Sequence, residues 1–349
     1  MHEKMRRTST ASKCSFSYVD QQELEVTFDG QEIWIIDPRA GVQSHWTCHV
    51  SGGQLWLEAV FGTPTFADES HWLAAFEVVF ASYGNHNHLC IPNAPAWPHG
   101  ILHAGIFVAL DSRIATVTRE ALWQCPRLWI TNVDSFPSTR PPSRDNSTSR
   151  SPKPGETLYR RHIAWLGKTL TFRTIDLEQD LHNFNRWMNE PLVAKFWQQE
   201  GDITTHRSYI EGIAQNPCIT ALIGCFDSEP FGYFETYWAK GDRIAPFYDV
   251  EDFDRGWHAL VGEAQLRGKP YVTAWMPSIS HYLFLDDLRT KRIVVEPRVD
   301  NDRMIRSLQK NGFAILKEFD FPHKRAVLAM LHRKRFFNEI PWTSNPLNS

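Results

Sequence analysis

One stretch of this 349-residue chain combines a histidine with a basic, glycine-containing segment. In FDRGWHALVGEAQLRGKPY, residues 253–271, His258 is followed seven residues later by QLRGK. An imidazole titrates near neutral pH, which makes His258 a candidate general base. A glycine-containing loop before a helix offers backbone N–H groups to a phosphate, and Arg267 and Lys269 would add positive charge. These features predict a catalytic site beside a phosphate-binding loop; a core histidine beside a polar turn is the alternative interpretation.

The elements that position these residues follow from the hydrophobic pattern of the second half of the chain. The predicted elements are strands at 169–175, 257–263 and 292–296, a hairpin that turns at 228–229, helices at 176–190, 270–285 and 301–311, and two final strands at 313–321 and 325–332. Asp176 and Asp300 are the expected N-caps, and Pro277 should kink its helix or begin the second part of it. The strand at 257–263 runs directly into QLRGK, so we expect His258 to lie near the ligand of that loop.

The first 135 residues are predicted to form a separate accessory domain. Its expected elements are strands at 24–28, 32–37, within 51–62 and at 127–133, and a helix at 69–83. No catalytic arrangement of residues is found in this part of the sequence. Residues 136–156 contain many Pro and Ser and few apolar residues, which is typical of an extended linker. The predicted organisation is therefore an accessory domain at 1–135, a linker at 136–156 and a catalytic domain at 157–349.

The composition narrows the possible partners. The net charge of -3, from 37 Lys and Arg and 40 Asp and Glu, does not favour nucleic acid. No apolar run reaches the length of about 18 residues that a membrane span needs. The first residues are basic but lack the apolar segment of a signal peptide, so a cytoplasmic protein is expected. The six cysteines and 15 histidines show no zinc-type spacing, so no metal is predicted.

Several motifs together resemble a known superfamily. The chain resembles the acetyl-CoA site of the GNAT acetyltransferases in several motifs. In order along the sequence they are QLRG at 265–268, Glu296-Pro297, Asn301 and NGF at 311–313. More narrowly, the chain resembles the hydroxylysine acetyltransferases of aerobactin-type siderophore synthesis. The segments that carry this resemblance are RWMNEPLVAKFW (186–197), FDRGWHALVGE (253–263) and EFDFPHKR (318–325). The superfamily usually has a second small residue where Pro270 stands, and proline brings no N–H group to the loop.

The resemblance implies a GNAT fold of the α+β class, in which a mixed central sheet is flanked by helices. It implies direct transfer of an acetyl group from acetyl-CoA to an N-hydroxylated amine, which yields a hydroxamate for siderophore biosynthesis. The implied acceptor is N6-hydroxylysine, a hydroxylated ornithine or a hydroxylated diamine. The implied residues for binding acetyl-CoA are Gln265, Arg267, Gly268, Lys269 and Asn301.

The roles of individual residues at the reacting centre follow from this reaction. A hydroxylamine is largely neutral at pH 7, but its nitrogen must still lose a proton, and we assign His258 as the general base. Glu296 is the first candidate for a carboxylate that orients His258, ahead of Asp300, Asp286 and Asp287. The candidates for substrate binding are Trp187, Trp238, Glu235, Asp254 and Arg255, with Trp197, Asp242 and Arg243 as weaker ones. Arg243 or Arg255 would meet an α-carboxylate. Core packing is the alternative for the tryptophans, and a solvated loop is the alternative for Asp242.

Three other functions are compatible with parts of the sequence. A GNAT enzyme that acts on aminoglycosides or polyamines would need a strongly acidic pocket, which the near-neutral composition does not favour. A non-catalytic acyl-CoA-binding protein is favoured only by Pro270, and a metal protein only by the number of histidines. For the first domain we hypothesise a degenerate relative of the second that packs against it or mediates a homodimer.

Overall fold

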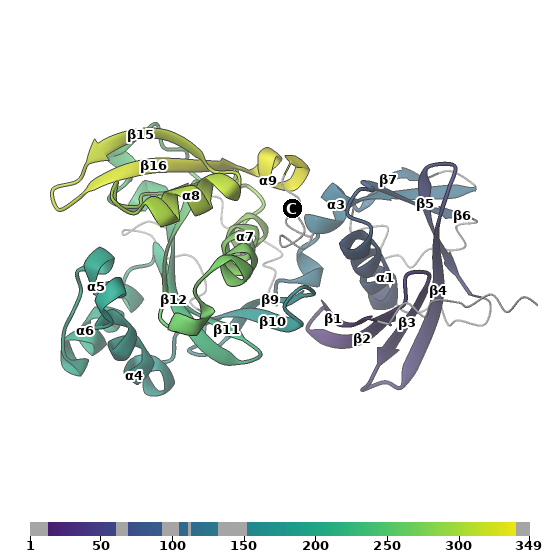
Figure 1. Cartoon of the computed structure of the whole chain (residues 1–349), viewed down its shortest axis with the longest axis horizontal. Coiled ribbons are helices and arrows are strands. Elements are labelled where there is room, and N and C mark those ends of the chain that lie inside the picture. Colours follow the sequence, from purple (N-terminus) through teal and green to yellow (C-terminus); the bar gives the residue numbers. More distant parts are fainter. Residues whose placement is uncertain (1–12, 61–68, 93–104, 111–112, 132–151, 340–349) are drawn as a thin grey trace, which may run out of the picture. The chain divides into compact units, whose positions relative to one another are not determined.

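The chain divides into two compact units, Met1–Leu128 and Trp129–Ser349. The computed structural model describes residues 13–60, 69–92, 105–110, 113–131 and 152–339 (Figure 1). Most of the predicted linker at 136–156 lies outside these described residues. The predicted strand at 127–133 is wrong where it is described, because Pro126–Leu128 form a 3-10 turn. Ile130 makes an isolated bridge to Tyr159 within the second unit, so tertiary pairing outweighs local strand propensity here.

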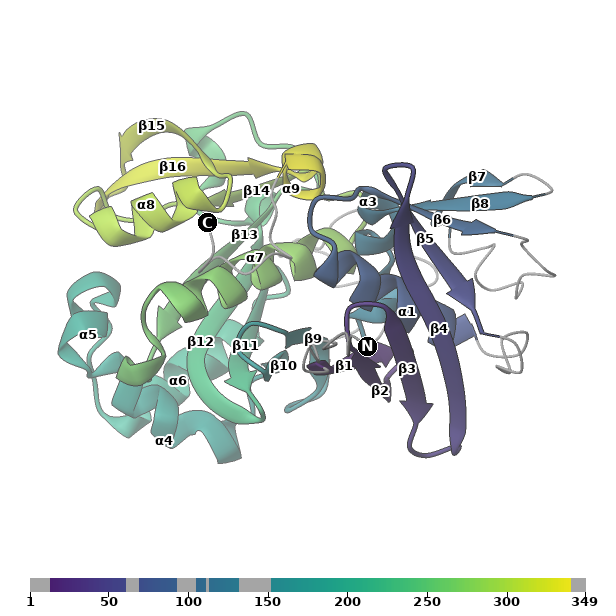
Figure 2. The same cartoon turned by 45° about the vertical axis from the view of Figure 1, so that its right-hand side comes forward.

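The first unit contains an eight-stranded sheet with a helix against it (Figure 2). Its strands are β1 (Lys13–Val19), β2 (Gln22–Phe28), β3 (Glu32–Asp37), β4 (Val42–Ser51), β5 (Gln54–Ala59), β6 (His88–Pro92), β7 (Phe107–Leu110) and β8 (Ile114–Thr118). Helix α1 (Glu69–Ser82) contacts β1 to β4, and the short helix α3 (Arg119–Trp123) follows β8. Buried residues alternate along β2 and β3, as the period-two pattern predicted.

The second unit contains another eight-stranded sheet, flanked by helices. Its strands are β9 (Thr157–Ile163), β10 (Lys168–Thr174), β11 (Ile219–Phe226), β12 (Glu229–Trp238), β13 (Arg255–Val261), β14 (Arg292–Val295), β15 (Ala314–Asp320) and β16 (Arg325–His332). Its α-helices are α4 (Leu177–Met188), α5 (Pro191–Trp197), α6 (Ile203–Ala214), α7 (Lys269–Asp286), α8 (Asp302–Lys310) and α9 (Arg333–Glu339). The predicted mixed sheet with flanking helices is confirmed.

Both sheets follow the same path. In each unit the first five strands form an antiparallel meander, and the fifth strand runs parallel to the sixth. The eighth strand then lies between the sixth and the seventh. A helix, α1 or α7, connects the fifth strand to the sixth, whereas α4 to α6 are an addition of the second unit between β10 and β11. The shared strand order supports the hypothesis that the first unit is a degenerate copy of the second, which stays a prediction together with its role in packing or dimerisation.

Local interactions explain where the helices of the second unit begin. Asp176 caps α4, because its carboxylate accepts a hydrogen bond from the Glu178 amide, as predicted. The predicted cap Asp300 is wrong: Asn301 caps α8 by accepting from the Met304 amide, while Asp300 pairs with Arg298. Pro277 lies inside α7, which continues through it as one helix.

A hydrophobic core packs the added helices against the strands of the candidate site. Phe184 and Trp187 of α4 are fully buried with Ile210 of α6 and with Tyr233 and Leu260 of the sheet. This packing places α4 and α6 against the β12–β13 pair. In the described part of the chain, no helix is both long and apolar enough to cross a lipid bilayer.

Candidate active site

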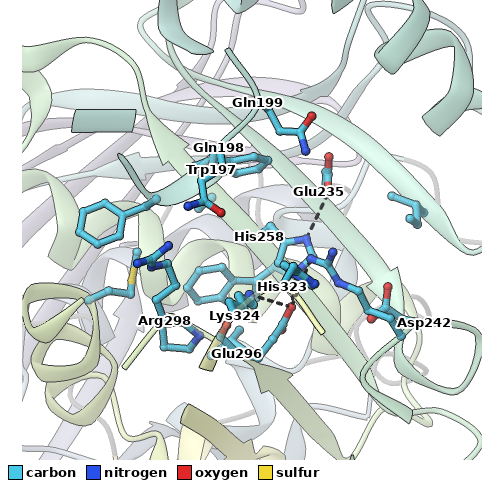
Figure 3. A pocket seen from close by; sticks show the side chains of 18 of the residues that line it. Trp197, Gln198, Gln199, Glu235, Asp242, His258, Glu296, Arg298, His323 and Lys324 are labelled. Atoms are coloured by element: carbon cyan, nitrogen blue, oxygen red, sulfur yellow. Dashed lines mark hydrogen bonds and ion pairs between the residues drawn. The ribbon is translucent and has the colours of Figure 1, made fainter. Parts of the chain in front are cut away.

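The candidate site lies where β13 and β14 separate. These parallel strands pair only through Arg255 with Ile293 and Gly256 with Val294, so β13 continues beyond the last pair without β14 beside it. A cavity of about 430 Å³ opens at this point and is lined by residues of both strands. His258 of β13 and Glu296, directly after β14, both line the cavity (Figure 3).

His258 lies between two buried carboxylates. Its Nε2 atom is 2.6 Å from Glu296 Oε1, and its Nδ1 atom is 3.1 Å from Glu235 Oε2. Figure 3 shows the imidazole between the two acids. Glu235 is 4% exposed and Glu296 2% exposed, so these carboxylates meet the imidazole in a setting of low polarity where charge pairs are strong. Glu296 was the expected carboxylate partner of His258. Glu235, which was predicted only as a substrate-binding residue, is a second partner.

Phenol groups hold both carboxylates in place. The hydroxyls of Tyr209 and Tyr233 donate to Glu235 Oε1 at 2.6 and 2.9 Å. The Tyr237 hydroxyl donates to Glu296 Oε2 at 2.8 Å. Space for the Tyr237 ring depends on Gly256, because a Cβ atom there would overlap the ring. The acids are thus fixed by their own donors and do not depend on His258 alone for their orientation.

The electrostatics of this group favour the charged form of His258. Burial lowers the pKa of His258, but the charge of Glu296 and the hydrogen bonds that the ring donates to both acids outweigh it and raise the pKa to about 10. Burial likewise opposes ionisation of Glu296, yet the adjacent imidazolium holds its pKa well below the usual range. The pKa of Glu235 is lowered for the same reason. At neutral pH the ligand-free site therefore contains an imidazolium between two carboxylates.

A second group of charged residues lines the same cavity. Asp242 and Arg243 come from the loop after β12, and His323 and Lys324 from the turn between β15 and β16. Lys324 Nζ donates to the Glu296 backbone carbonyl at 2.8 Å and lies 3.8 Å from its carboxylate. From the sequence, the run PHKRA at 322–326 was a candidate contact for the CoA 3′-phosphate, with a polar turn as the alternative. The structure places His323 and Lys324 of this run in the lining of the cavity.

The predicted phosphate-binding loop has the expected place in the fold. Helix α7 begins after Gly268, whose φ of 121° suits glycine, and no side chain caps the helix. Gln265 lies exposed in the loop and donates to Glu263 at 3.3 Å. The Arg267 guanidinium, in contrast, is engaged with Glu190 at 2.9 Å and with the carbonyls of Val261 and Gly262. Of the two cations predicted in this loop, Arg267 is thus in an ion pair, whereas Lys269 forms none among the described residues.

Four of the predicted substrate-binding residues lie outside the cavity lining. Trp187 is 1% exposed in the core and donates to Glu263 at 2.9 Å. Asp254 is buried and accepts from Arg292, and Arg255 pairs with Asp286 and lies over the Trp238 ring. These residues therefore support the loop and the strand ends. Trp197, Glu235, Asp242, Arg243 and Asn301 do line the cavity.

Comparison with known proteins identifies a family and several relatives. Residues 176–321 match the model of the family described as "Acetyltransferase (GNAT) domain". The chain is 42% identical over 228 residues to the N(6)-hydroxylysine O-acetyltransferase of Escherichia coli, which covers 64% of this chain and 72% of that protein. It is also 42% identical over 225 residues to a Schizosaccharomyces pombe protein named "Putative lysine N-acyltransferase". That match covers 64% of this chain and 67% of the S. pombe protein. An uncharacterised Bacillus halodurans protein of known structure superimposes with a TM-score of 0.51 at 26% identity, covering 55% of this chain and 96% of that one.

The fold, the cavity between separated strands and these matches define an acyltransferase. The chain belongs to the GNAT acetyltransferase family, which confirms the fold and the enzyme class that its motifs implied. Within that family its relatives include an enzyme named for acetyl transfer to hydroxylysine. The alternative of a non-catalytic binding protein is set aside by this membership.

Proposed function

We propose that this enzyme transfers an acetyl group from acetyl-CoA to the N-hydroxylated side-chain amine of a small acceptor, and so makes a hydroxamate for siderophore biosynthesis. The observation that carries the proposal is the imidazole of His258 between Glu235 and Glu296, at the point where β13 and β14 separate. The similarity to the E. coli hydroxylysine acetyltransferase supports the choice of acceptor.

Acetyl-CoA would bind along β13 with its phosphates at the start of α7. The first amides of α7 carry no side-chain cap, and a helix N-terminus favours an anion. Lys269 adds a positive charge at this end, and Gln265 lies in the same loop. Asn301 lies on the other side of the strand opening, where it caps α8 and lines the cavity. A thioester that extends from the α7 end along β13 would reach His258.

The reaction then needs one proton to be moved. The neutral hydroxylamine nitrogen attacks the thioester carbonyl carbon, forming the C–N bond, and collapse of the tetrahedral intermediate breaks the C–S bond. The nitrogen loses one proton, and the departing CoA thiolate gains one, so atoms and charge balance without any other reactant. A group beside both atoms is required to carry that proton.

We assign this role to His258, as a shuttle. Because both ring nitrogens face carboxylates, the ligand-free imidazolium has no free lone pair with which to act as a base. It can first give its proton to the departing sulfur, once a reactant opens one of its two carboxylate bonds. The neutral imidazole then takes the proton from nitrogen. The general-base role expected from the sequence is thus the second half of the proposed cycle, and Glu235 and Glu296 orient the ring throughout.

The cavity does not suit the polycationic acceptors of the alternative GNAT enzymes. Arg243, Arg298, Lys324 and the His258 imidazolium line it together with its three acids, so it carries no excess of negative charge. An aminoglycoside or polyamine needs an excess of acids. The charge content therefore favours a smaller acceptor with fewer positive groups.

The test is an acetyl-CoA thiol-release assay with N6-hydroxylysine, combined with detection of the hydroxamate by its coloured ferric complex. Wild-type enzyme should release thiol and form hydroxamate in equal amounts. His258→Ala should lower kcat by roughly 10²–10⁴, as expected for loss of a proton-transfer group. Equal rates for wild type and variant would remove His258 from the mechanism, and no turnover of any hydroxylated amine would overturn the proposed function.

A further inference from the structure

One end of the cavity carries neighbouring charges of opposite sign. Asp242 and Arg243 are consecutive residues of the loop between β12 and β13, and both line the cavity that contains His258. The turn between β15 and β16 brings His323 to the same cavity. Figure 3 shows Asp242 to one side of His258 and Glu296. A ligand whose reacting nitrogen lies at His258 would place its far end among these residues.

Asp242 has no cation at ion-pair distance among the described residues. Its Oδ1 atom accepts a hydrogen bond from the Ile244 amide at 3.0 Å, and no ion pair to Asp242 is formed in this part of the chain. Partial burial and the nearby charge of Glu296 raise the pKa of Asp242, although the charges of His258 and Arg243 oppose this rise. An ammonium group from a ligand would bring a cation into direct contact with Asp242, and opposite charges at short distance favour ionisation.

Arg243 is a cation with no carboxylate at hydrogen-bonding distance among the described residues. Its guanidinium packs over the Phe321 ring with its Cζ atom 5.6 Å from the ring centre, which sets its orientation. The nearest carboxylate is Glu296 at 3.9 Å, too long for a hydrogen bond, and Glu296 already accepts from His258 and Tyr237. The planar donor face of Arg243 thus remains available for a bidentate partner such as a carboxylate.

A third residue completes this end of the cavity. The His323 ring stacks on Phe321, with ring centres 5.4 Å apart and planes at 26°. Phe321 therefore packs against both Arg243 and His323. A carboxylate bound by Arg243 would have a second possible donor in His323.

We propose that the acceptor is an N-hydroxylated α-amino acid whose zwitterionic head group is read by Asp242 and Arg243. The α-ammonium pairs with Asp242, and the α-carboxylate pairs with Arg243, with His323 as a further donor. This inference rests on the proposed function and narrows it, because a hydroxylated diamine has an ammonium group but no carboxylate. A diamine would leave Arg243 without a partner and would be the poorer substrate.

Three acceptors separate the two contacts. N6-hydroxylysine has both head-group charges, N-hydroxycadaverine lacks the carboxylate, and 6-(hydroxyamino)hexanoate lacks the α-ammonium. Steady-state kcat/KM is measured for each with wild-type enzyme, Arg243→Met and Asp242→Asn. The matched controls are Lys240→Met and Asp252→Asn, which remove the two members of an exposed ion pair in the same loop that does not line the cavity.

Arg243→Met should lower kcat/KM about 10- to 100-fold for hydroxylysine and the hexanoate, as loss of a charged hydrogen-bonded pair predicts, and leave hydroxycadaverine within about two-fold. Asp242→Asn should lower it for hydroxylysine and hydroxycadaverine but not for the hexanoate. The control variants should behave as wild type with all three acceptors. Each acceptor is also titrated into ligand-free enzyme by calorimetry, where the same order of affinities is expected without turnover.

The inference would be overturned if wild-type enzyme used hydroxycadaverine as well as hydroxylysine, or if Arg243→Met affected both acceptors equally. In either case acetyl transfer to a hydroxylamine would still stand. Absence of turnover with all three acceptors would instead overturn the proposed function, and the inference with it. The two failures are therefore distinct in the same set of measurements.

Discussion

Glu235 lies directly opposite His258 in the antiparallel pairing of β12 and β13. The contact between Glu235 Oε2 and His258 Nδ1, at 3.1 Å, is thus a cross-strand pair set by backbone register. Glu296 reaches the other ring nitrogen from the end of a different strand. The first unit has the same strand path but not this chemistry: aligned on the parallel strand pairs, Glu58 and Pro92 occupy the positions of His258 and Glu296.

The Glu235→Gln variant tests the proposed shuttle through its pH dependence. Two carboxylates raise the pKa of His258 to about 10, so removal of one charge should lower that pKa toward the ordinary value of about 6.5. The shuttle needs the imidazolium at the start of each cycle. The alkaline limb of the kcat/KM profile should therefore move to lower pH in Glu235→Gln and stay in place in the surface variant Asp252→Asn. An unchanged limb would contradict the role given to Glu235.

The same group predicts how stability changes with pH. The pKa of His258 is raised on folding, so its contribution is fully present below about pH 6.5 and is lost as the pH rises toward about 10. The pKa values of Glu235 and Glu296 are lowered on folding, so their contributions are present above about pH 4.5 and are lost on acidification. The group should stabilise the fold most between these limits.

Urea unfolding at several pH values measures this effect. Between pH 6.5 and 9.5 the free energy of unfolding of wild-type protein should fall by about 2–4 kcal/mol from this histidine. His258→Gln cannot titrate, and its unfolding free energy should change much less over the same interval. Parallel curves for the two proteins would show that the carboxylates do not raise the pKa of His258.

The sequence predicted those parts of the site that depend on local order. His258, the loop at 265–269 and Glu296 follow one another along consecutive elements, so their proximity was accessible from strand order. The pairing of Glu235 with His258 was not, because it depends on the register of two strands joined by a long irregular loop. The sequence also did not show that Arg267 is paired with Glu190 whereas Lys269, in the same loop, is not.

Tryptophan positions illustrate the same limit. The pattern around Trp187 fits either a pocket wall or a core, and the structure places Trp187 in the core because Gly262 lets the ring pack directly beneath the loop. Trp197, from the same segment, does line the cavity. Side-chain packing between distant elements decides between such residues, and a single sequence does not contain that information in its periodicity.

The two cations of the loop at 265–269 should differ in their effects when replaced. Arg267 bonds to Glu190 and to two backbone carbonyls, so Arg267→Ala should reduce the free energy of unfolding by about 1–2 kcal/mol. Lys269→Ala should leave stability unchanged but weaken acetyl-CoA binding several-fold, with a smaller salt dependence of Kd. Urea unfolding and calorimetric titration with acetyl-CoA at two salt concentrations distinguish the residues. A stable Arg267→Ala protein with weakened acetyl-CoA binding would return Arg267 to the phosphate site.

Gly262 offers a test of how the core supports that loop. A Cβ atom at position 262 would overlap the Trp187 ring, which is buried and bonded to Glu263, so the ring or the loop must shift in Gly262→Ala. Overpacking of this kind should lower the free energy of unfolding by about 1–3 kcal/mol. Because the displaced segment leads into the α7 N-terminus, the affinity for acetyl-CoA should fall as well.

Gly212 provides the matched control for this substitution. It lies in α6 with no atom within 4 Å of an added Cβ, so Gly212→Ala should raise the unfolding free energy by about 1 kcal/mol through its better helix propensity. Its affinity for acetyl-CoA should equal that of wild type. If Gly262→Ala were as stable as Gly212→Ala and bound acetyl-CoA normally, close packing of Trp187 under the loop would not be what positions the start of α7.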